Sequence, residues 1–474
     1  MTPFAILALL ALAPAELRPN IVLVYCDDLG YADIGPFGAK TTRTPNLDKL
    51  AKRGRTFTNF HVAQPVCSAS RAALLTGCYP NHLGIHGALG PKARHGIHAE
   101  EETIAELLKG GGYQTAAIGK WHLGHREPFL PTRHGFDSYF GLPYSNDMWP
   151  HHPETKKGTY PNLPLFRNEK VINEDVTPMD QSHLTDLYTK ESVRFIETSA
   201  QTGKPFFLYL AHSMPHVPLF AGPKFAGKSP AGTLGDVIEE IDDSVGQVMA
   251  ALEKSAALET TWIIFTSDNG PWLSYGDHAG SSGPFREGKG TCFEGGVRVP
   301  CIMSWPGRLP ANNRADTNFM TIDLLPTIAA QLNLVRKGPA IDGRNVWDFI
   351  TAKPGAQNPH EGYAFYYENN QLQAVASNDG RYKLQLPHIY RTLSGRPGGK
   401  GGIPAKYDQK TIVLPQLYDL IADPSETKDI SATEPEILQK LLRFAQKCRT
   451  DMGDSLTKSV GNGLRSAGIL PDGQ

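Results

Sequence analysis

The chain lacks a surplus of charge of either sign, because its 47 lysines and arginines balance 48 aspartates and glutamates. A formal net charge of -1 provides no field for a polyanion, which excludes duplex nucleic acid as an expected partner. The 474 residues also lack an internal repeat at solenoid spacing. Beyond the N-terminal stretch, no run of consecutive apolar residues is long enough to cross a bilayer, so we expect no membrane span.

Cysteine is also scarce, with six residues in a chain of this length. Their spacing differs from that of a small disulfide-rich domain and assigns no pairing. Apolar residues make up 40% of the chain, an ordinary share for a globular protein, which excludes wholesale disorder. Glycine and proline are abundant, with 47 and 37 residues, and indicate many shaped loops, as in an enzyme.

Residues 1–15 have the pattern of a secretory signal peptide. An apolar run at residues 4–12 is followed by Ala-Pro-Ala at residues 13–15, small residues at the spacing that signal peptidase requires. The run is too short for a stop-transfer helix. We therefore expect an exported protein, periplasmic or secreted. The alternative is that this segment is a short N-terminal extension of a core strand.

Residues 16–352 alternate strand and helix signals, which predicts a large domain of the α/β class. Continuous apolar runs, typical of parallel strands buried on both faces, occur at residues 20–26, 115–118, 205–211 and 261–267. Helical patterns separate these runs, and one opens at Thr44-Pro45 with Thr44 as its cap. Repeated right-handed crossovers predict a large, mostly parallel sheet flanked by helices.

Residues 353–474 are predicted to form a smaller C-terminal α+β subdomain. Short, partly alternating runs indicate antiparallel strands at residues 363–367, 373–377 and 382–386. A helix is expected over residues 434–449. The Gly-rich stretch at residues 395–402 predicts a surface loop.

Polar side chains follow four of the predicted strands, at the edge where an open α/β sheet binds its ligands. The first strand is followed by Asp27 and Asp28, and the last by Asp268 and Asn269. Carboxylate and amide oxygens suit a hard cation such as Ca²⁺ or Mg²⁺ better than Zn²⁺. An Asp-Asp pair alone is more often a helix cap or a solvated turn, but the second pair at an equivalent strand end favours a metal site.

Cys67 begins a predicted helix, where free backbone N–H groups favour negative charge. Arg71 lies four residues on and therefore on the same helix face. Taken alone, Cys67 would be read as a buried structural cysteine.

The motifs extend well beyond this cysteine. Residues 67–71 read Cys-Ser-Ala-Ser-Arg, residues 119–124 read Gly-Lys-Trp-His-Leu-Gly, and residues 134–137 read His-Gly-Phe-Asp. Further motifs are Gly-Lys-Gly at residues 288–290 with Phe-Glu-Gly-Gly at 293–296, and Leu-Tyr-Asp-Leu at 417–420. Together they resemble the formylglycine-dependent type I sulfatases of the alkaline phosphatase superfamily, most closely the arylsulfatase A and N-acetylgalactosamine-6-sulfatase branch. The resemblance covers nearly the whole mature chain and implies an alkaline-phosphatase-like fold.

This resemblance implies a nucleophile and a metal. Cys67 matches the cysteine that is oxidised to formylglycine (3-oxoalanine), whose hydrated form also contacts the metal. A formylglycine-generating enzyme is therefore an implied partner during maturation. Four residues match the ligands of one calcium ion: Asp27, Asp28, Asp268 and Asn269.

The resemblance also assigns the surrounding side chains. Arg71 matches the residue that holds the hydrate, and His122 matches the base near it. Lys120 and Lys289 match the contacts to sulfate oxygens. His216 matches the leaving-group histidine.

His212 matches that role less well than His216. It is expected to be either a neighbouring pocket residue or a strand-end histidine whose hydrogen bonds are satisfied locally. Ala69 stands where most of the family has Pro, and this departure is expected to slow oxidation of Cys67.

The implied function is an exported, calcium-dependent sulfatase acting on sulfated sugars or aryl sulfates. One alternative is a phosphate or phosphonate monoester hydrolase on the same fold, and another is an inactive sulfatase-like protein that binds glycans. Candidate substrate walls are the segments at residues 144–147, 272–278 and 388–406. Because the net charge is close to zero, short oligosaccharides or chain ends are expected as substrates rather than long polyanions.

Overall fold

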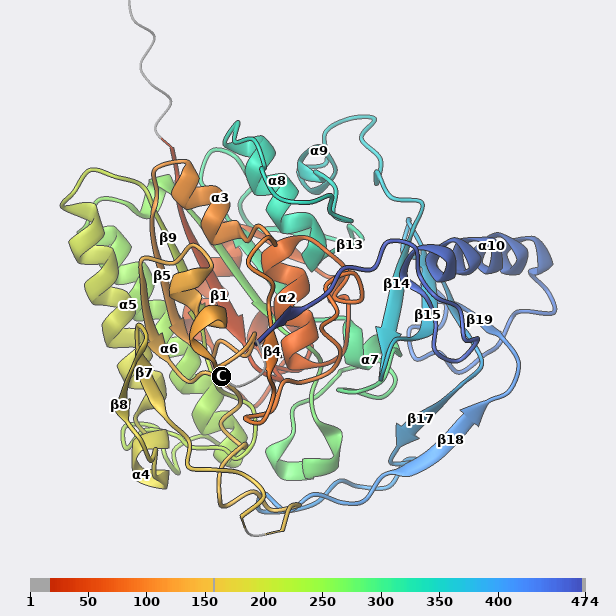
Figure 1. Cartoon of the computed structure of the whole chain (residues 1–474), viewed down its shortest axis with the longest axis horizontal. Helices are drawn as coiled ribbons and strands as arrows, with labels where there is room; N and C mark the ends of the chain where they lie inside the picture. Colours follow the sequence, from red (N-terminus) through yellow and green to blue (C-terminus); the bar gives the residue numbers. More distant parts are fainter. Residues whose placement is uncertain (1–17, 157, 471–474) are drawn as a thin grey trace, which may run out of the picture.

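A ten-stranded sheet forms the centre of the protein (Figure 1). The computed structural model describes residues 18–156 and 158–470, so the predicted signal peptide lies outside the described residues. The strand order is β12-β2-β11-β10-β1-β9-β5-β6-β7-β8. In that order the strands span Asn313–Ala315, Arg55–Phe57, Cys301–Ser304, Thr261–Ser267, Asn20–Cys26, Phe206–Ala211, Gln114–Gly119, Ser138–Gly141, Leu165–Arg167 and Lys170–Asn173.

The middle of this sheet is parallel, as the apolar runs predicted. The strands β10, β1, β9, β5 and β6 are all paired in parallel. Toward the edges the pairing becomes mixed, because β11 lies antiparallel to both β10 and β2, and β7 lies antiparallel to β6 and β8. The edge strands are short, and their sequences carry no continuous apolar run by which to recognise them.

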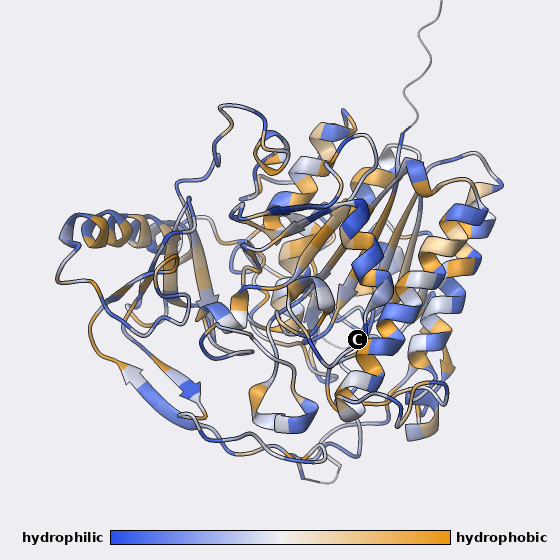
Figure 2. Cartoon of the chain, turned by 180° about the vertical axis from the view of Figure 1, so that it is seen from behind, coloured by the Kyte–Doolittle hydropathy of each residue, from blue (hydrophilic) through white to orange (hydrophobic). Residues whose placement is uncertain are grey.

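Alternate side chains of the central strands enter two separate apolar cores. Ile21, Leu23 and Tyr25 of β1 pack with the helices α2 (Cys67–Thr76), α3 (Ile104–Gly110) and α8 (Leu324–Gln331). Val22 and Val24 face the opposite side and pack with α1 (Pro45–Arg53), α5 (Leu184–Ala200) and α6 (Gly232–Lys254). Figure 2 shows apolar strands between helices that carry both apolar and polar residues. Burial on both faces explains why these strands read as continuous apolar runs.

The first helix begins at Pro45 as predicted, but Thr44 does not cap it. The Thr44 hydroxyl accepts a hydrogen bond from the backbone of Gly35 instead. The carboxylate of Asp242, on α6, accepts the N–H groups of Asn46 and Leu47 at 3.0 and 2.8 Å. The free N–H groups at the start of this helix are therefore bound by a side chain 195 residues away, and not by the predicted cap.

The C-terminal part contains the predicted antiparallel sheet and helix. The sheet order is β14-β15-β16-β19, with strands at Gly362–Tyr367, Gln371–Ser377, Tyr382–Gln385 and Gln416–Asp419. Helix α10 (Pro435–Met452) packs on this sheet (Figure 1). A separate ribbon pairs β17 (His388–Thr392) with β18 (Asp408–Ile412). The chain then returns to the large domain, where β20 (Gly468–Ile469) pairs with β4 (His95–Gly96).

The described part of the chain also contains the short helices α4 (Pro178–Gln181), α7 (Glu294–Val297) and α9 (Trp347–Ile350). The predicted division after residue 352 falls between α9 and β14. Within the described residues, no helix combines the length and apolarity needed to traverse a bilayer.

Candidate active site

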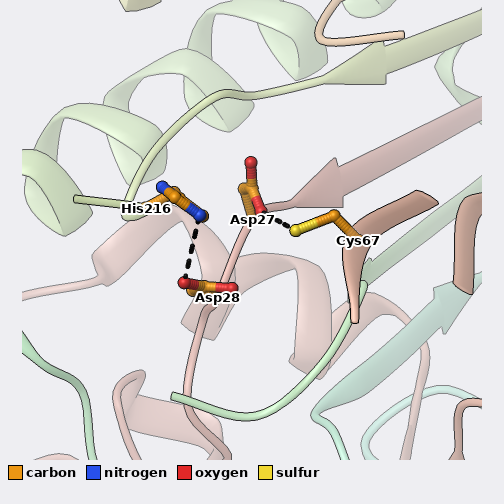
Figure 3. A group of neighbouring side chains, drawn as sticks. All are labelled: Asp27, Asp28, Cys67 and His216. Atoms are coloured by element: carbon orange, nitrogen blue, oxygen red, sulfur yellow. Dashed lines mark hydrogen bonds and ion pairs between the residues drawn. The ribbon is translucent and has the colours of Figure 1, made fainter. Parts of the chain in front are cut away.

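The carboxyl ends of the central parallel strands deliver the predicted site residues to one edge of the sheet. Asp27 and Asp28 follow β1, Lys120 follows β5, and Asp268 follows β10. Helix α2 brings Cys67 to the same place from its first position. Figure 3 shows the side chains of Asp27 and Cys67 pointing toward each other. These five residues are almost fully buried, so no bulk water screens their charges.

Carboxylates and cations alternate in this cluster. The ammonium of Lys120 donates to Asp27, and that of Lys289 lies 2.7 Å from Asp28 Oδ1. The Arg71 guanidinium donates to Asp268 Oδ2 at 2.8 Å and lies 3.6 Å from Asp27. Each buried carboxylate therefore has at least one cation against it, as burial of charge requires.

Cys67 lies between opposite charges. Its Sγ is 3.7 Å from Asp27 Oδ1, and the Lys289 ammonium donates to it at 3.4 Å. Burial raises the pKa of the Cys67 thiol to about 12, because the nearby lysines only partly offset the loss of solvation. As a cysteine, this side chain stays a neutral thiol and is a poor nucleophile.

The acidic cluster has the donor chemistry of a hard-cation site. Ligand atoms of Asp27, Asp28, Cys67 and His216 lie within 4.8 Å of one another. Asn269 Oδ1 is buried without a hydrogen-bond partner in the described part of the chain, while the Asn269 amide donates to Asp28 Oδ1 at 2.7 Å. Burial and the charge of Asp27 raise the pKa of Asp268 to about 7. An unpartnered oxygen and crowded carboxylates are features that a calcium ion would relieve.

The two predicted catalytic histidines occupy different settings. His122 is buried, its Nε2 lies 2.9 Å from the Leu89 carbonyl, and its Nδ1 has no described partner. Burial, reinforced by the charges of Lys120 and Arg71, holds the His122 pKa well below its ordinary value, so the ring is neutral. A neutral ring with a free nitrogen can accept a proton.

His216 lies beside the carboxylates. Its Nε2 is 3.6 Å from Asp28 Oδ2, and its Nδ1 lies against the Val217 carbonyl. A dashed line in Figure 3 marks the contact between His216 and Asp28. Hydrogen bonding through Nδ1 leaves Nε2 as the nitrogen that faces the site. Burial makes the largest contribution and lowers the His216 pKa. The positive charge of Lys289 lowers this pKa further, whereas the negative charge of Asp28 raises it.

His212 points away from this cluster. Its Nε2 lies 3.3 Å from the hydroxyl of Ser244 on α6, and its ring lies beside Tyr188 of α5. Burial lowers its pKa to about 3. Its Nδ1 is buried without a hydrogen-bond partner among the described residues, so the expectation of a locally satisfied strand-end histidine is met at Nε2 alone.

Ser145 is a site residue that the sequence marked only as part of a loop. Its hydroxyl accepts a hydrogen bond from the Lys120 ammonium at 3.1 Å and lies 3.5 Å from His216 Nε2. It therefore bridges two of the predicted residues. The sequence signal that could have found it is weak, because a single serine in a loop has no diagnostic spacing.

Comparison with known proteins adds an independent observation. The family model described as Sulfatase matches residues 19–334. The chain is 35% identical over 460 residues to N-acetylgalactosamine-6-sulfatase of Sus scrofa, covering 92% of this chain and 86% of that protein. It is 36% identical to arylsulfatase A of Homo sapiens, covering 93% and 89%. Among solved structures, the PsFucS1 sulfatase from Pseudoalteromonas sp. superimposes with a TM-score of 0.82 at 29% identity, covering 94% of this chain and 92% of that one.

Proposed function

We propose a mechanism from the premise that the chain belongs to the sulfatase family and is a sulfuric ester hydrolase. In this proposal Cys67 is converted to formylglycine and one calcium ion is held beside it. The observation that carries the proposal is the position of the Cys67 Sγ, 3.7 Å from Asp27 Oδ1 and 3.4 Å from the Lys289 ammonium. Oxidation of this side chain would place its oxygen atoms against both a cation ligand and a lysine.

The proposed metal ligands are Asp27, Asp28, Asp268 and Asn269, together with the modified residue at position 67. When bound, formylglycine and calcium would supply an oxygen nucleophile and a Lewis acid that withdraws charge from sulfate oxygens. Three carboxylates and an amide oxygen match the preference of Ca²⁺ for irregular oxygen cages.

The basic residues act on the sulfate and on the nucleophile. Lys120 and Lys289 are proposed to contact sulfate oxygens, where charge builds up in the transition state, and Arg71 to hold the residue at position 67. Each ammonium is already held in place by an aspartate, so little reorganisation is needed at the moment of reaction. Loss of one such preorganised donor costs about 10²–10³ in rate.

The two histidines divide the proton transfers. His122 is neutral and has an unpartnered Nδ1, which suits a base that removes a proton near position 67. Burial and the charge of Lys289 lower the His216 pKa, and the nearby carboxylates offset this only in part. His216 presents Nε2 toward Asp28 and into the site. It is proposed to protonate the departing oxygen, a task worth about 10²–10⁴ in rate.

The proposed substrates are sulfated sugars, with aryl sulfates as smaller substrates. A solved structure that is 30% identical, with a TM-score of 0.75, is described as Ps i-CgsB in complex with k-i-k-neocarrahexaose, which supports a carbohydrate ligand. Two of the predicted walls touch each other, since the backbone N–H groups of Gly399 and Ala405 donate to the carbonyl of Ser274. The Trp272 ring lies 5.7 Å from that of His216 and is proposed to contact the sugar. Export through the N-terminal signal remains part of this proposal.

The test is to express the chain with and without a formylglycine-generating enzyme and to assay 4-nitrocatechol sulfate hydrolysis. Mass spectrometry of the peptide containing residue 67 measures the converted fraction. Activity should rise in proportion to that fraction, fall on chelation and return with Ca²⁺. Full activity in protein that carries only the unmodified thiol would refute the proposal.

Because every expected site position is filled and the residues converge, catalysis is proposed rather than passive glycan binding. Among the residues that the structure describes, no contact in the site favours a phosphate ester over a sulfate ester.

A further inference from the structure

We propose that Arg391 is a positioning residue that holds Lys289 in the active site. Arg391 belongs to β17, in the ribbon that Figure 1 shows on the side of the small C-terminal sheet. The inference rests on the proposed function, because it takes Lys289 to act on the sulfate. It gives the C-terminal part of the chain a role in positioning a residue of the site.

The backbone around Lys289 is fixed from three directions. Lys289 N–H donates to the Pro271 carbonyl, and Gly290 N–H donates to the Pro65 carbonyl, both at 2.9 Å. The third contact comes from Arg391, whose Nε donates to the Lys289 carbonyl at 3.1 Å and whose Nη2 donates to the same oxygen. A forked guanidinium on one carbonyl sets both the position and the orientation of that peptide group.

The backbone at Gly290 lies close against the Arg391 guanidinium. Gly290 has a φ of +76°, and a Cβ built there would lie 2.2 to 2.6 Å from atoms of the Arg391 guanidinium. Only glycine combines that backbone conformation with so close an approach. The guanidinium therefore rests directly on the peptide that follows Lys289.

The indole of Trp272 links the Arg391 guanidinium to the rest of the site. The Arg391 guanidinium lies 5.8 Å from the centre of the Trp272 ring and 4.9 Å from that of Tyr407. The Lys289 ammonium lies 4.6 Å from the Trp272 ring, and the His216 ring lies 5.7 Å from it. Loss of Arg391 would free both the Lys289 carbonyl and one face of this indole.

Arg391 has no competing structural ion pair within the described part of the chain. No described carboxylate lies within 4.0 Å of its guanidinium, and its described hydrogen bonds go to Lys289. A surface arginine of the same region differs in this respect, since Arg381 donates to Asp419 at 3.0 and 2.8 Å. Arg381→Met is therefore a matched control that removes a guanidinium without touching the site.

The experiment measures kcat and KM for 4-nitrocatechol sulfate in calcium-loaded, full-length protein with a known fraction of formylglycine. Arg391→Met should lower kcat about 10- to 100-fold with KM within twofold, because misplacing a catalytic group by about 1 Å costs about 10²-fold. Arg391→Lys, which keeps the charge and one donor, should recover part of the loss. Added guanidinium ion should partly restore the Met variant. Arg381→Met should match the wild type.

A double variant separates positioning from a general structural role. In a Lys289→Met background, Arg391→Met should lower kcat by less than a further twofold, because the group it positions is already gone. Three results would overturn the inference. The first is a double variant in which the kcat losses of the two single variants multiply. The others are a wild-type kcat in Arg391→Met, or a raised KM with an unchanged kcat in that variant. Thermal melting of every variant identifies misfolding, and Arg391→Lys keeps the test decisive if the Met variant does not fold. Absence of turnover in converted wild-type protein would instead overturn the proposed function.

Discussion

Replacing Glu294 by glutamine should destabilise the protein far more than the same change at an exposed glutamate. The Glu294 carboxylate joins three separate segments, because it accepts from Lys383 Nζ of β16 at 2.7 Å and lies 3.1 Å from His61 Nε2 of β3 (Phe60–His61). Arg298 adds a contact at 3.2 Å. Both Glu294 and Lys383 have fully buried side chains. The substitution removes the one carboxylate that lies within 4.0 Å of the Lys383 ammonium among the described residues.

Breaking a buried pair in this way costs about 3–5 kcal/mol. At about 2 °C per kcal/mol in a large chain, Tm should fall by about 6–10 °C at pH 7. The matched control is Glu361→Gln, because Glu361 and Lys447 form a pair of the same type at the same 2.7 Å, but with side chains 52% and 65% exposed. An exposed pair contributes about 0–1 kcal/mol, so this variant should shift Tm by 2 °C at most, on the same scale of about 2 °C per kcal/mol.

The pH dependence of the Tm difference between wild type and Glu294→Gln tests whether the lost carboxylate charge causes the destabilisation. Burial raises the pKa of Glu294, but the charges of Lys383 and His61 outweigh it and hold this pKa well below its ordinary value of 4.5. The carboxylate therefore contributes stability above pH 4.5 that is lost as the pH falls toward the folded-state pKa. The Tm gap between wild type and Glu294→Gln, followed by differential scanning fluorimetry, should be constant near pH 7 and narrow below pH 4.5. Equal Tm shifts for the two substitutions, or a gap that widens in acid, would refute this reasoning.

Three further predictions concern the site. Asp28→Asn should lower the calcium bound per chain and reduce kcat at least about 10²-fold. Full metal content by atomic emission would contradict the ligand assignment. Ala69→Pro should raise the fraction of converted Cys67, measured by peptide mass, with an unchanged rate per converted chain; a lower fraction would show that Ala69 does not limit maturation. Short sulfated oligosaccharides should be desulfated faster than the intact polymer or an aryl sulfate, because sugar contacts help to position the transition state. Preferential attack on internal units of the polymer would rule out this preference.

The sequence predicted the central strands, and the structure confirms them. The predicted site residues also lie together at one edge of the sheet, while their roles stay a proposal. Continuous apolar runs such as residues 20–26 and 261–267 coincide with β1 and β10. A strand covered on both faces must be apolar throughout, so its pattern is local and can be read without knowing its neighbours. Because parallel strands end on one side of the sheet, the residues that follow them, such as Asp27 and Asp268, converge by topology alone.

The family motifs also identified candidate site residues in loops, where the sequence has no helical or strand periodicity. Lys289 lies in a turn, and only its resemblance to a family motif marked it in the sequence. Its proximity to Asp28 and Cys67 is now a structural observation, whereas its role in catalysis stays a proposal.

Tertiary structure alone decided which distant side chains support these elements. The N–H groups at the start of α1 bond to Asp242 rather than to Thr44, and Ser145 meets Lys120 across a loop. Glu294 finds Lys383 across 89 residues, and Arg391 reaches Lys289 across 102. Local patterns report whether a residue is buried, because burial repeats with the period of the strand or helix. They do not report which partner lies opposite, since that depends on how whole elements pack against one another.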